Sequence, residues 1–207
     1  MIAIIDCGMG NLRSVYNAFR SLGREATIAS KPEQLRDARG IVLPGVGAFG
    51  DGMRNLREWG FVEELDAQVL HGGKPFLGLC LGMQLLATTG FEHGENLGLN
   101  WIHGTVERIR FPESNEMPRI PHIGWNEVRF EKRDGLYAGL GESQSFYFVH
   151  SFVLKPNDPC VVSGVCDYGV DIVASVEFGN ISATQFHPEK SHKAGLAVLR
   201  NWSEELC

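Results

Sequence analysis

The stretch Lys74-Pro75-Phe76-Leu77-Gly78-Leu79-Cys80-Leu81-Gly82 places a cysteine between two glycines at the end of an apolar run. The apolar residues predict a buried strand, and the residues that follow the cysteine predict a helix over 82–87. A strand that turns into a helix through Gly-x-Cys-x-Gly is the thiol version of a nucleophile elbow, which presents its nucleophile above the carboxyl edge of a sheet. Glycines suit so tight a turn because they carry no side chain.

Two physical features of this turn favour Cys80 as a nucleophile. The N-terminus of the predicted helix stabilises a thiolate, and the backbone N–H of Leu81 can donate a hydrogen bond to an oxyanion there. Most free cysteines, however, behave as small buried hydrophobic side chains. Considered alone, the motif leaves a catalytic thiol and a packing cysteine about equally favoured.

A second motif, Ala183-Thr184-Gln185-Phe186-His187-Pro188-Glu189, decides between these two interpretations. Pro188 biases His187 towards an extended backbone, in which side chains two residues apart point to the same side, so Glu189 can reach His187. A thiol, an imidazole and a carboxylate that orients the imidazole are the three parts of an activated nucleophile. His-x-Glu alone is usually a solvated loop, but together with the elbow it predicts a catalytic triad of Cys80, His187 and Glu189.

A third motif, Leu43-Pro44-Gly45-Val46-Gly47-Ala48-Phe49, ends another predicted strand in a glycine-rich turn. Such a turn exposes backbone N–H groups where a second oxyanion donor is required. A phosphate cradle is the alternative use of a glycine-rich turn. No Gly-Lys-Ser/Thr ending follows it, so a nucleotide-binding P-loop is not supported.

The order of the predicted elements indicates a single α/β domain over residues 1–207. In the first half, predicted strands alternate with predicted helices: strands at 1–6, 41–43 and 74–79, and helices at 11–22 and 51–70, the second broken near Gly60. This alternation is typical of a mostly parallel sheet covered on both faces. The second half contains short β-rich segments that predict added antiparallel strands, at 104–110, 126–130, 144–149, 161–165, 172–177 and 181–185. A helix over 193–206 closes the chain.

Composition limits the classes of function. The chain has 207 residues, of which 43% are hydrophobic and 21% are charged, as in ordinary soluble domains. Its net charge of -6 argues against a nucleic-acid partner. No stretch approaches the ~20 apolar residues that span a bilayer, and Asp6 interrupts the apolar N-terminus, so we expect a soluble, cytoplasmic protein with no membrane partner. The five cysteines lack C-x-x-C spacing and the other histidines lack metal-ligand spacing, so we expect no disulfide framework, metal or cofactor.

The segments Gly-Leu-Cys-Leu-Gly-Met-Gln at 78–84 and Gln-Phe-His-Pro-Glu-Lys at 185–190 resemble the signature of class I, or triad, glutamine amidotransferases. Four further segments resemble one branch of that family, the glutaminase subunits of imidazole glycerol phosphate synthase in histidine biosynthesis: 5–12, 43–49, 121–126 and 146–151. The resemblance runs from end to end. It implies the family's three-layer α/β fold, with a mostly parallel central sheet and added antiparallel strands.

The resemblance also implies a reaction. Cys80 would attack the side-chain amide of glutamine, while His187 acts first as a base and then as an acid towards the departing ammonia. The γ-glutamyl thioester would then be hydrolysed to glutamate. By the same resemblance, the oxyanion would lie between the backbone of Leu81 and that of Val46 and Gly47. The glutamine pocket would be lined by Gly47, Gln84 and the strand from Tyr147 to Ser151.

A partner is the last implication of the resemblance. A (β/α)₈-barrel cyclase would dock over the mouth of the active site and receive ammonia through its interior. Asn11, Trp125 and Lys190 lie in motifs that the family uses at or near that interface; a helix cap, a core aromatic side chain and a surface lysine are the respective alternatives. Cys7 stands where the family more often has an aromatic residue, and we interpret it as a packing residue.

Other functions compete with this one. The segments Pro121–Asn126 and His187–Gly195 also resemble a paralogous group, which feeds ammonia to a cyclase-like barrel that modifies a surface-polysaccharide sugar. Its glutaminase chemistry would be identical. A non-catalytic binding subunit would be expected to lose a member of the triad, and none is lost. A cysteine peptidase would share the elbow but would not account for the pocket and interface motifs.

Overall fold

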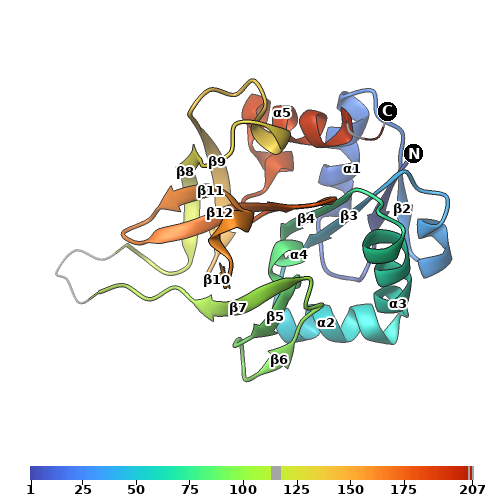
Figure 1. Cartoon of the computed structure of the whole chain (residues 1–207), viewed down its shortest axis with the longest axis horizontal. Helices are drawn as coiled ribbons and strands as arrows, with labels where there is room; N and C mark the ends of the chain where they lie inside the picture. The colour runs from blue at the N-terminus through green and yellow to red at the C-terminus, as the bar shows by residue number, and fades with distance from the viewer. Residues whose placement is uncertain (113–117, 205, 207) are drawn as a thin grey trace.

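The computed structural model describes residues 1–112, 118–204 and 206, and within them the strands form two sheets (Figure 1). The larger sheet has nine strands in the order β2-β1-β3-β4-β13-β12-β11-β8-β9. Its first five strands are parallel: β2 (Ala26–Ala29), β1 (Ile2–Ile5), β3 (Gly40–Gly45), β4 (Phe76–Cys80) and β13 (Ile181–Thr184). The other four continue the sheet with antiparallel pairings: β12 (Asp171–Phe178), β11 (Val162–Asp167), β8 (His122–Phe130) and β9 (Ser143–His150).

Helices cover both faces of the parallel half. Helices α1 (Leu12–Ser21) and α5 (His192–Glu204) lie over one face, and α2 (Phe49–Glu58) and α3 (Phe61–Leu65) lie over the other (Figure 1). Strand β1 shows why both faces are apolar: Ile2 and Ile4 pack in the core beneath α1 and α5, whereas Ala3 and Ile5 pack in the core beneath α2 and α3. Since successive side chains of a strand point to opposite faces, a doubly covered strand must be apolar throughout.

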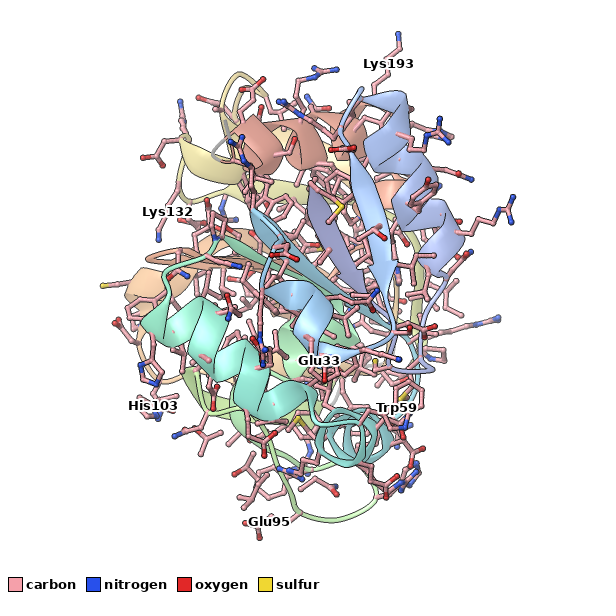
Figure 2. All side chains as sticks on the ribbon, turned by 90° about the vertical axis from the view of Figure 1, so that its right-hand side faces the viewer. Glu33, Trp59, Glu95, His103, Lys132 and Lys193 are labelled. Carbon is pink, nitrogen blue, oxygen red and sulfur yellow. The ribbon has the colours of Figure 1, made fainter. Side chains whose placement is uncertain are left out.

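The smaller sheet has the strand order β10-β7-β5-β6. It consists of β10 (Phe152–Pro156), β7 (Ile102–Arg108), β5 (Ala87–Gly90) and β6 (Asn96–Leu97). The remaining elements are short: η1 (Pro32–Leu35), η2 (Asp66–His71), α4 (Leu81–Gln84), η3 (Gly135–Tyr137), η4 (Pro159–Val161) and η5 (Pro188–Lys190). Charged side chains such as Glu95 and Lys193 point outward into solvent (Figure 2).

The predicted α/β class, the alternation of the first half and the antiparallel additions are confirmed. The helix expected at 51–70 is broken at Gly60, which has φ 73°, and its last part is the π-helix η2. The helix expected at 193–206 is α5; residue 205 and Cys207 lie outside the described residues. Within the described ranges, no helix is long and apolar enough to cross a membrane.

Two predictions about secondary structure are wrong. The helix expected over 82–87 ends at Gln84, because the carbonyl groups of Leu85, Leu86 and Ala87 accept hydrogen bonds from the backbone of residues 99–102 instead of from a continuing helix. The strand expected at 104–110 does not join the large sheet, because β7 pairs with β10 and β5. Strands β2, β5, β6 and β10 were not predicted.

Candidate active site

The nucleophile elbow is formed where β4 passes into α4. Cys80, the last residue of β4, has φ 53° and ψ -106°, a conformation that non-glycine residues rarely adopt. Such strain costs about 1–3 kcal/mol and persists where the surrounding structure determines it. The side chain of Cys80 is 5% exposed and lies at the carboxyl edge of the parallel strands. The structure therefore has the sharp turn that the sequence predicts.

Close packing of α4 on β3 explains the second glycine of the elbow. A Cβ atom added to Gly82 would lie 1.8 Å from the carbonyl oxygen of Leu43, which belongs to the backbone of β3 and cannot rotate away. Any side chain at this position would push α4, and with it Cys80, away from the sheet.

The Gly82→Ala variant is therefore expected to be less stable than the wild-type chain. Overpacking of this kind typically costs ~1–3 kcal/mol or more, which corresponds to a fall in the melting temperature of about 2–12 °C for a chain of this size. Gly10→Ala is the matched control, since its Cβ would approach nothing closer than 3.6 Å. Thermal denaturation of the two variants tests this, and equal melting temperatures would contradict the close-packing argument.

His187 and Glu189 lie next to each other after β13. The Nδ1 atom of His187 is 2.8 Å from Oε1 of Glu189, and both side chains are almost fully buried, at 4% and 3% exposed. The backbone of His187 is held on both sides, because its N–H donates to the carbonyl of Tyr147 and its carbonyl accepts from the hydroxyl of Ser191. Nε2 of His187 is buried without a hydrogen-bond partner among the described residues. It is the nitrogen left for the thiol once Glu189 holds Nδ1.

The electrostatics of His187 favour its charged form. Burial lowers the pKa of His187, but its interactions with the nearby Cys80 sulfur and with Glu189 outweigh burial and raise the pKa from 6.5 to about 9. At neutral pH the imidazole is then protonated beside the sulfur, and a cationic neighbour of this kind activates a cysteine as a nucleophile.

The other cysteines of the described part of the chain have the opposite environment. Burial raises the pKa of the Cys7 thiol and raises that of Cys166 to about 12. A hydrogen bond to Asp158 raises the pKa of Cys160, which is exposed. These three thiols are therefore held in their neutral form.

A cavity of about 580 Å³ opens over Cys80. Five of the six residues predicted to bind the oxyanion or the substrate line it, namely Val46, Gly47, Leu81, Gln84 and Ser151. Tyr147 does not line it; its backbone instead bonds to His187 and to Ser191. The remaining lining residues are Cys80, Ala48, Glu92, Pro121, Val149, His150, Phe152 and Lys190. Of these, Val149 and His150 belong to the predicted pocket strand from Tyr147 to Ser151, whereas Glu92 was not predicted, because a carboxylate after a short turn gives little signal in a sequence.

The two predicted oxyanion donors are in different states. The N–H of Leu81 lies at the first position of α4, where no intrahelical acceptor exists. The N–H of Val46, in contrast, donates to the carbonyl of Met9 at 3.3 Å. The next residue, Gly47, has φ 114°, and a Cβ there would lie 2.6 Å from the Met9 side chain. A rotation of the peptide groups in this turn would be needed to free the Val46 donor.

Two of the three residues predicted at the interface, Trp125 and Lys190, lie against the same side chain, that of Tyr147. Trp125 is 48% exposed and stacks on His192, with ring centres 4.8 Å apart, so it is not a core aromatic residue. Its ring centre is 6.2 Å from that of Tyr147, over which the ammonium group of Lys190 lies at 5.8 Å. Asn11 is the N-cap of α1, where its side chain accepts from the N–H of Ser14.

Comparison with known proteins places this site in context. A family model described as glutamine amidotransferase class-I matches residues 3–205. The imidazole glycerol phosphate synthase subunit HisH of Geobacter sulfurreducens is 48% identical over 207 residues, which cover 98% of each chain. The subunit of the same name from Methanothermobacter thermautotrophicus is 48% identical over 204 residues, covering 99% of this chain and 98% of the relative.

Solved structures with lower identity share the fold. A chain in the structure of PurLQS from Thermotoga maritima has a TM-score of 0.76 at 21% identity, covering 100% of this chain and 98% of that one. A crystal structure of a glutamine amidotransferase has a TM-score of 0.77 at 24% identity, covering 100% and 99% of the two chains.

Proposed function

Because the chain belongs to the class-I glutamine amidotransferase family, we propose that it is the glutaminase subunit of an imidazole glycerol phosphate synthase in histidine biosynthesis. It hydrolyses glutamine to glutamate and ammonia and passes the ammonia to a second subunit. The observation that carries the chemistry is the juxtaposition of Cys80 at a strained elbow with the buried pair of His187 and Glu189. Relatives named as subunits of that synthase are 48% identical to this chain over nearly its full length, which supports the biological role.

The geometry supports a two-stage reaction in which His187 donates a proton in the first stage and accepts one in the second. The thiolate of Cys80 attacks the amide carbon of glutamine, and the N–H of Leu81 stabilises the resulting oxyanion. Protonated His187 then gives its proton to the leaving nitrogen, so ammonia departs and a γ-glutamyl thioester remains. Neutral His187 takes a proton from water, which attacks the thioester and releases glutamate and the thiolate. Glu189 holds the imidazole throughout.

The charges of the cavity match the substrate. Glu92 and Lys190 bring a carboxylate and an ammonium group to its lining, and free glutamine carries one ammonium and one carboxylate. The Glu92 side chain is held by the N–H of Phe49 at 2.8 Å. Both amide protons of Gln84 are used within the protein, on Phe152 and Gln185, so its oxygen is the atom available to the amide of the substrate.

Exposed apolar residues around the cavity support a docking role for this face. Val46 is 41% exposed at the cavity, and Ile123 and Trp125, which follow the cavity residue Pro121 along β8, are 58% and 48% exposed. Large apolar side chains gathered on one face of a protein typically mark an interaction site. We infer that a (β/α)₈-barrel cyclase covers this face and receives the ammonia.

The isolated chain is expected to be a weak glutaminase, because the Val46 N–H is bonded to Met9 and cannot serve the oxyanion. Loss of one oxyanion donor typically lowers kcat by ~10²–10³. The test compares glutamate formation by the chain alone and by the chain mixed with a histidine-pathway cyclase and its aminoimidazole-forming substrate. Tight association and a rise in kcat of that size are expected, and full activity of the lone chain would contradict the withheld donor.

The same experiment separates the proposal from the paralogous alternative. A glutaminase that serves a polysaccharide-modifying synthase would neither bind the histidine-pathway cyclase tightly nor support its glutamine-dependent turnover. Activity that appears only with the cyclase-like subunit of a polysaccharide-modifying synthase would assign the chain to the paralogous group. The triad chemistry would be the same in that case.

A further inference from the structure

Gln185 is a buried amide beside the nucleophile to which the mechanism above gives no role. It is 0% exposed, directly follows β13, and its backbone N–H donates to the carbonyl of Ala174 at 2.8 Å. It precedes His187 by two residues, so in an extended backbone the two side chains point to the same side. The side-chain Nε2 of Gln185 lies 3.6 Å from the Sγ atom of Cys80, within hydrogen-bonding distance for sulfur.

Neighbouring groups fix which end of this amide faces the sulfur. The carbonyl of Phe152 can only accept a hydrogen bond, so the Gln84 atom 2.9 Å from it must be the nitrogen. That same nitrogen lies 2.9 Å from the other amide, so the Gln185 atom that meets it must be the oxygen. The remaining end of the Gln185 amide, which faces Cys80, is therefore an N–H donor.

The Phe152 carbonyl, which fixes the orientation of both amides, is itself held in place by hydrogen bonds. The carbonyl of Phe152 also accepts from Nδ1 of His150 at 3.0 Å, and Nε2 of His150 accepts from Nδ1 of His122 at 3.0 Å. Burial lowers the pKa of His150 to about 3, so the imidazole is neutral. Its one N–H is then on Nδ1, and Nε2 is the acceptor. A buried hydrogen-bond network of this kind holds its members in place.

We propose that Gln185 is a further catalytic residue, which donates an amide N–H to the sulfur of Cys80 and stabilises its thiolate. The proposal rests on the glutaminase function given above. Gln185 gains and loses no proton. Its hydrogen bond is strongest when the sulfur is charged, as the thiolate attacks and again as the thioester breaks and the sulfur leaves. Since an amide does not titrate, Gln185 supports the thiolate at every pH, whereas His187 does so only while it is protonated.

The Gln185→Met variant tests this role, because methionine has a similar length and volume but no N–H. The rate of alkylation of Cys80 by iodoacetamide is measured against pH in the complex with its partner, with the Cys80 peptide followed by mass spectrometry. Hydrogen bonds to charged groups stabilise them enough for the midpoint of the profile to move up by about one pH unit, which slows alkylation below the midpoint by about tenfold. Gln144→Met, on an exposed part of β9, is the matched control and should reproduce the wild-type profile.

A second variant keeps the test decisive if methionine prevents folding. Gln185→Glu has nearly the same shape and can still accept from Gln84, but it turns an acceptor oxygen towards the sulfur. It is expected to move the midpoint further in the same direction. A folded variant of either kind whose profile superimposes on that of the wild type overturns the proposal. Alkylation needs no glutamine, so this result is separate from any failure of the wild-type complex to hydrolyse glutamine, which would refute the function instead.

Discussion

Replacing Cys80 with serine is expected to lower the kcat for glutamate formation by the assembled enzyme by a factor on the order of 10⁴ or more. Serine preserves the size of the side chain and the turn. Its hydroxyl, however, does not give up its proton to an imidazole as a thiol does, and the ion pair with His187 is lost. Single-turnover assays with glutamine measure the effect directly, and the γ-glutamyl thioester should not accumulate.

Two controls separate chemistry from structure in the Cys80→Ser variant. Cys160→Ser alters an exposed thiol held neutral by Asp158 and should leave kcat unchanged. The Cys80→Ser variant itself should still fold and bind its partner, since the hydrogen bonds of its sulfur to the described residues are long, at 3.9 Å to the Val149 carbonyl and 3.6 Å from the Gln185 amide. Glutamate formation within tenfold of the wild-type rate would show that another group is the nucleophile.

The parts of the site that could be predicted from the sequence are those that depend on local constraints. The elbow needs a tight turn within a few residues, and Gly82 reveals it because any side chain there would meet the backbone of β3. The contact of His187 with Glu189 joins residues two apart, and Pro188 between them limits the backbone that connects them. Local chemistry of this kind is visible in a single sequence.

The second sheet could not be predicted, since long-range pairing decides it. Residues 85–87 are all apolar and follow a predicted helix start, so the sequence favoured a continuing helix. Their carbonyl groups bond instead to residues 99–102, and Ala87 then enters β5 beside β7. The apolar pattern is the same for a buried helix and a buried strand, and only tertiary contacts distinguish the two.

The same limit applies to the state of the oxyanion donors and of the nucleophile. A glycine-rich turn indicates that an N–H can be presented, but not that the Val46 N–H is bonded to Met9. The Gln185 amide is visible in its motif only as a buried polar residue, and its meeting with Gln84 joins two segments far apart in the chain. Tyr147 lies in a pocket motif, yet it contributes through its backbone to the position of His187.

The Glu189→Gln variant is expected to lower kcat by a factor on the order of 10⁴, while the fold and the cavity stay intact. Glutamine matches the size of glutamate but carries no charge, so the imidazolium of His187 loses one of the two groups that hold its proton. Glu142→Gln is the matched control, because Glu142 pairs with Arg133 on the surface, where its side chain is 80% exposed. A loss of less than about tenfold would show that His187 is oriented by something other than Glu189.

The pH dependence of this variant gives the sharper test. In the wild type the pKa of His187 is raised from 6.5 to about 9, so ammonia can be protonated as it leaves until the pH rises through about 9. Without the charge of Glu189 the alkaline limb of kcat should move towards lower pH. Because the folded pKa lies above the ordinary value, protonation of His187 stabilises the wild-type fold in full below pH 6.5, and this contribution is lost as the pH rises towards 9. Denaturant titrations across that window should show the wild type losing more stability than the variant. Equal losses would mean that Cys80 alone supports the imidazolium, and Glu189 would then contribute only its hydrogen-bond geometry.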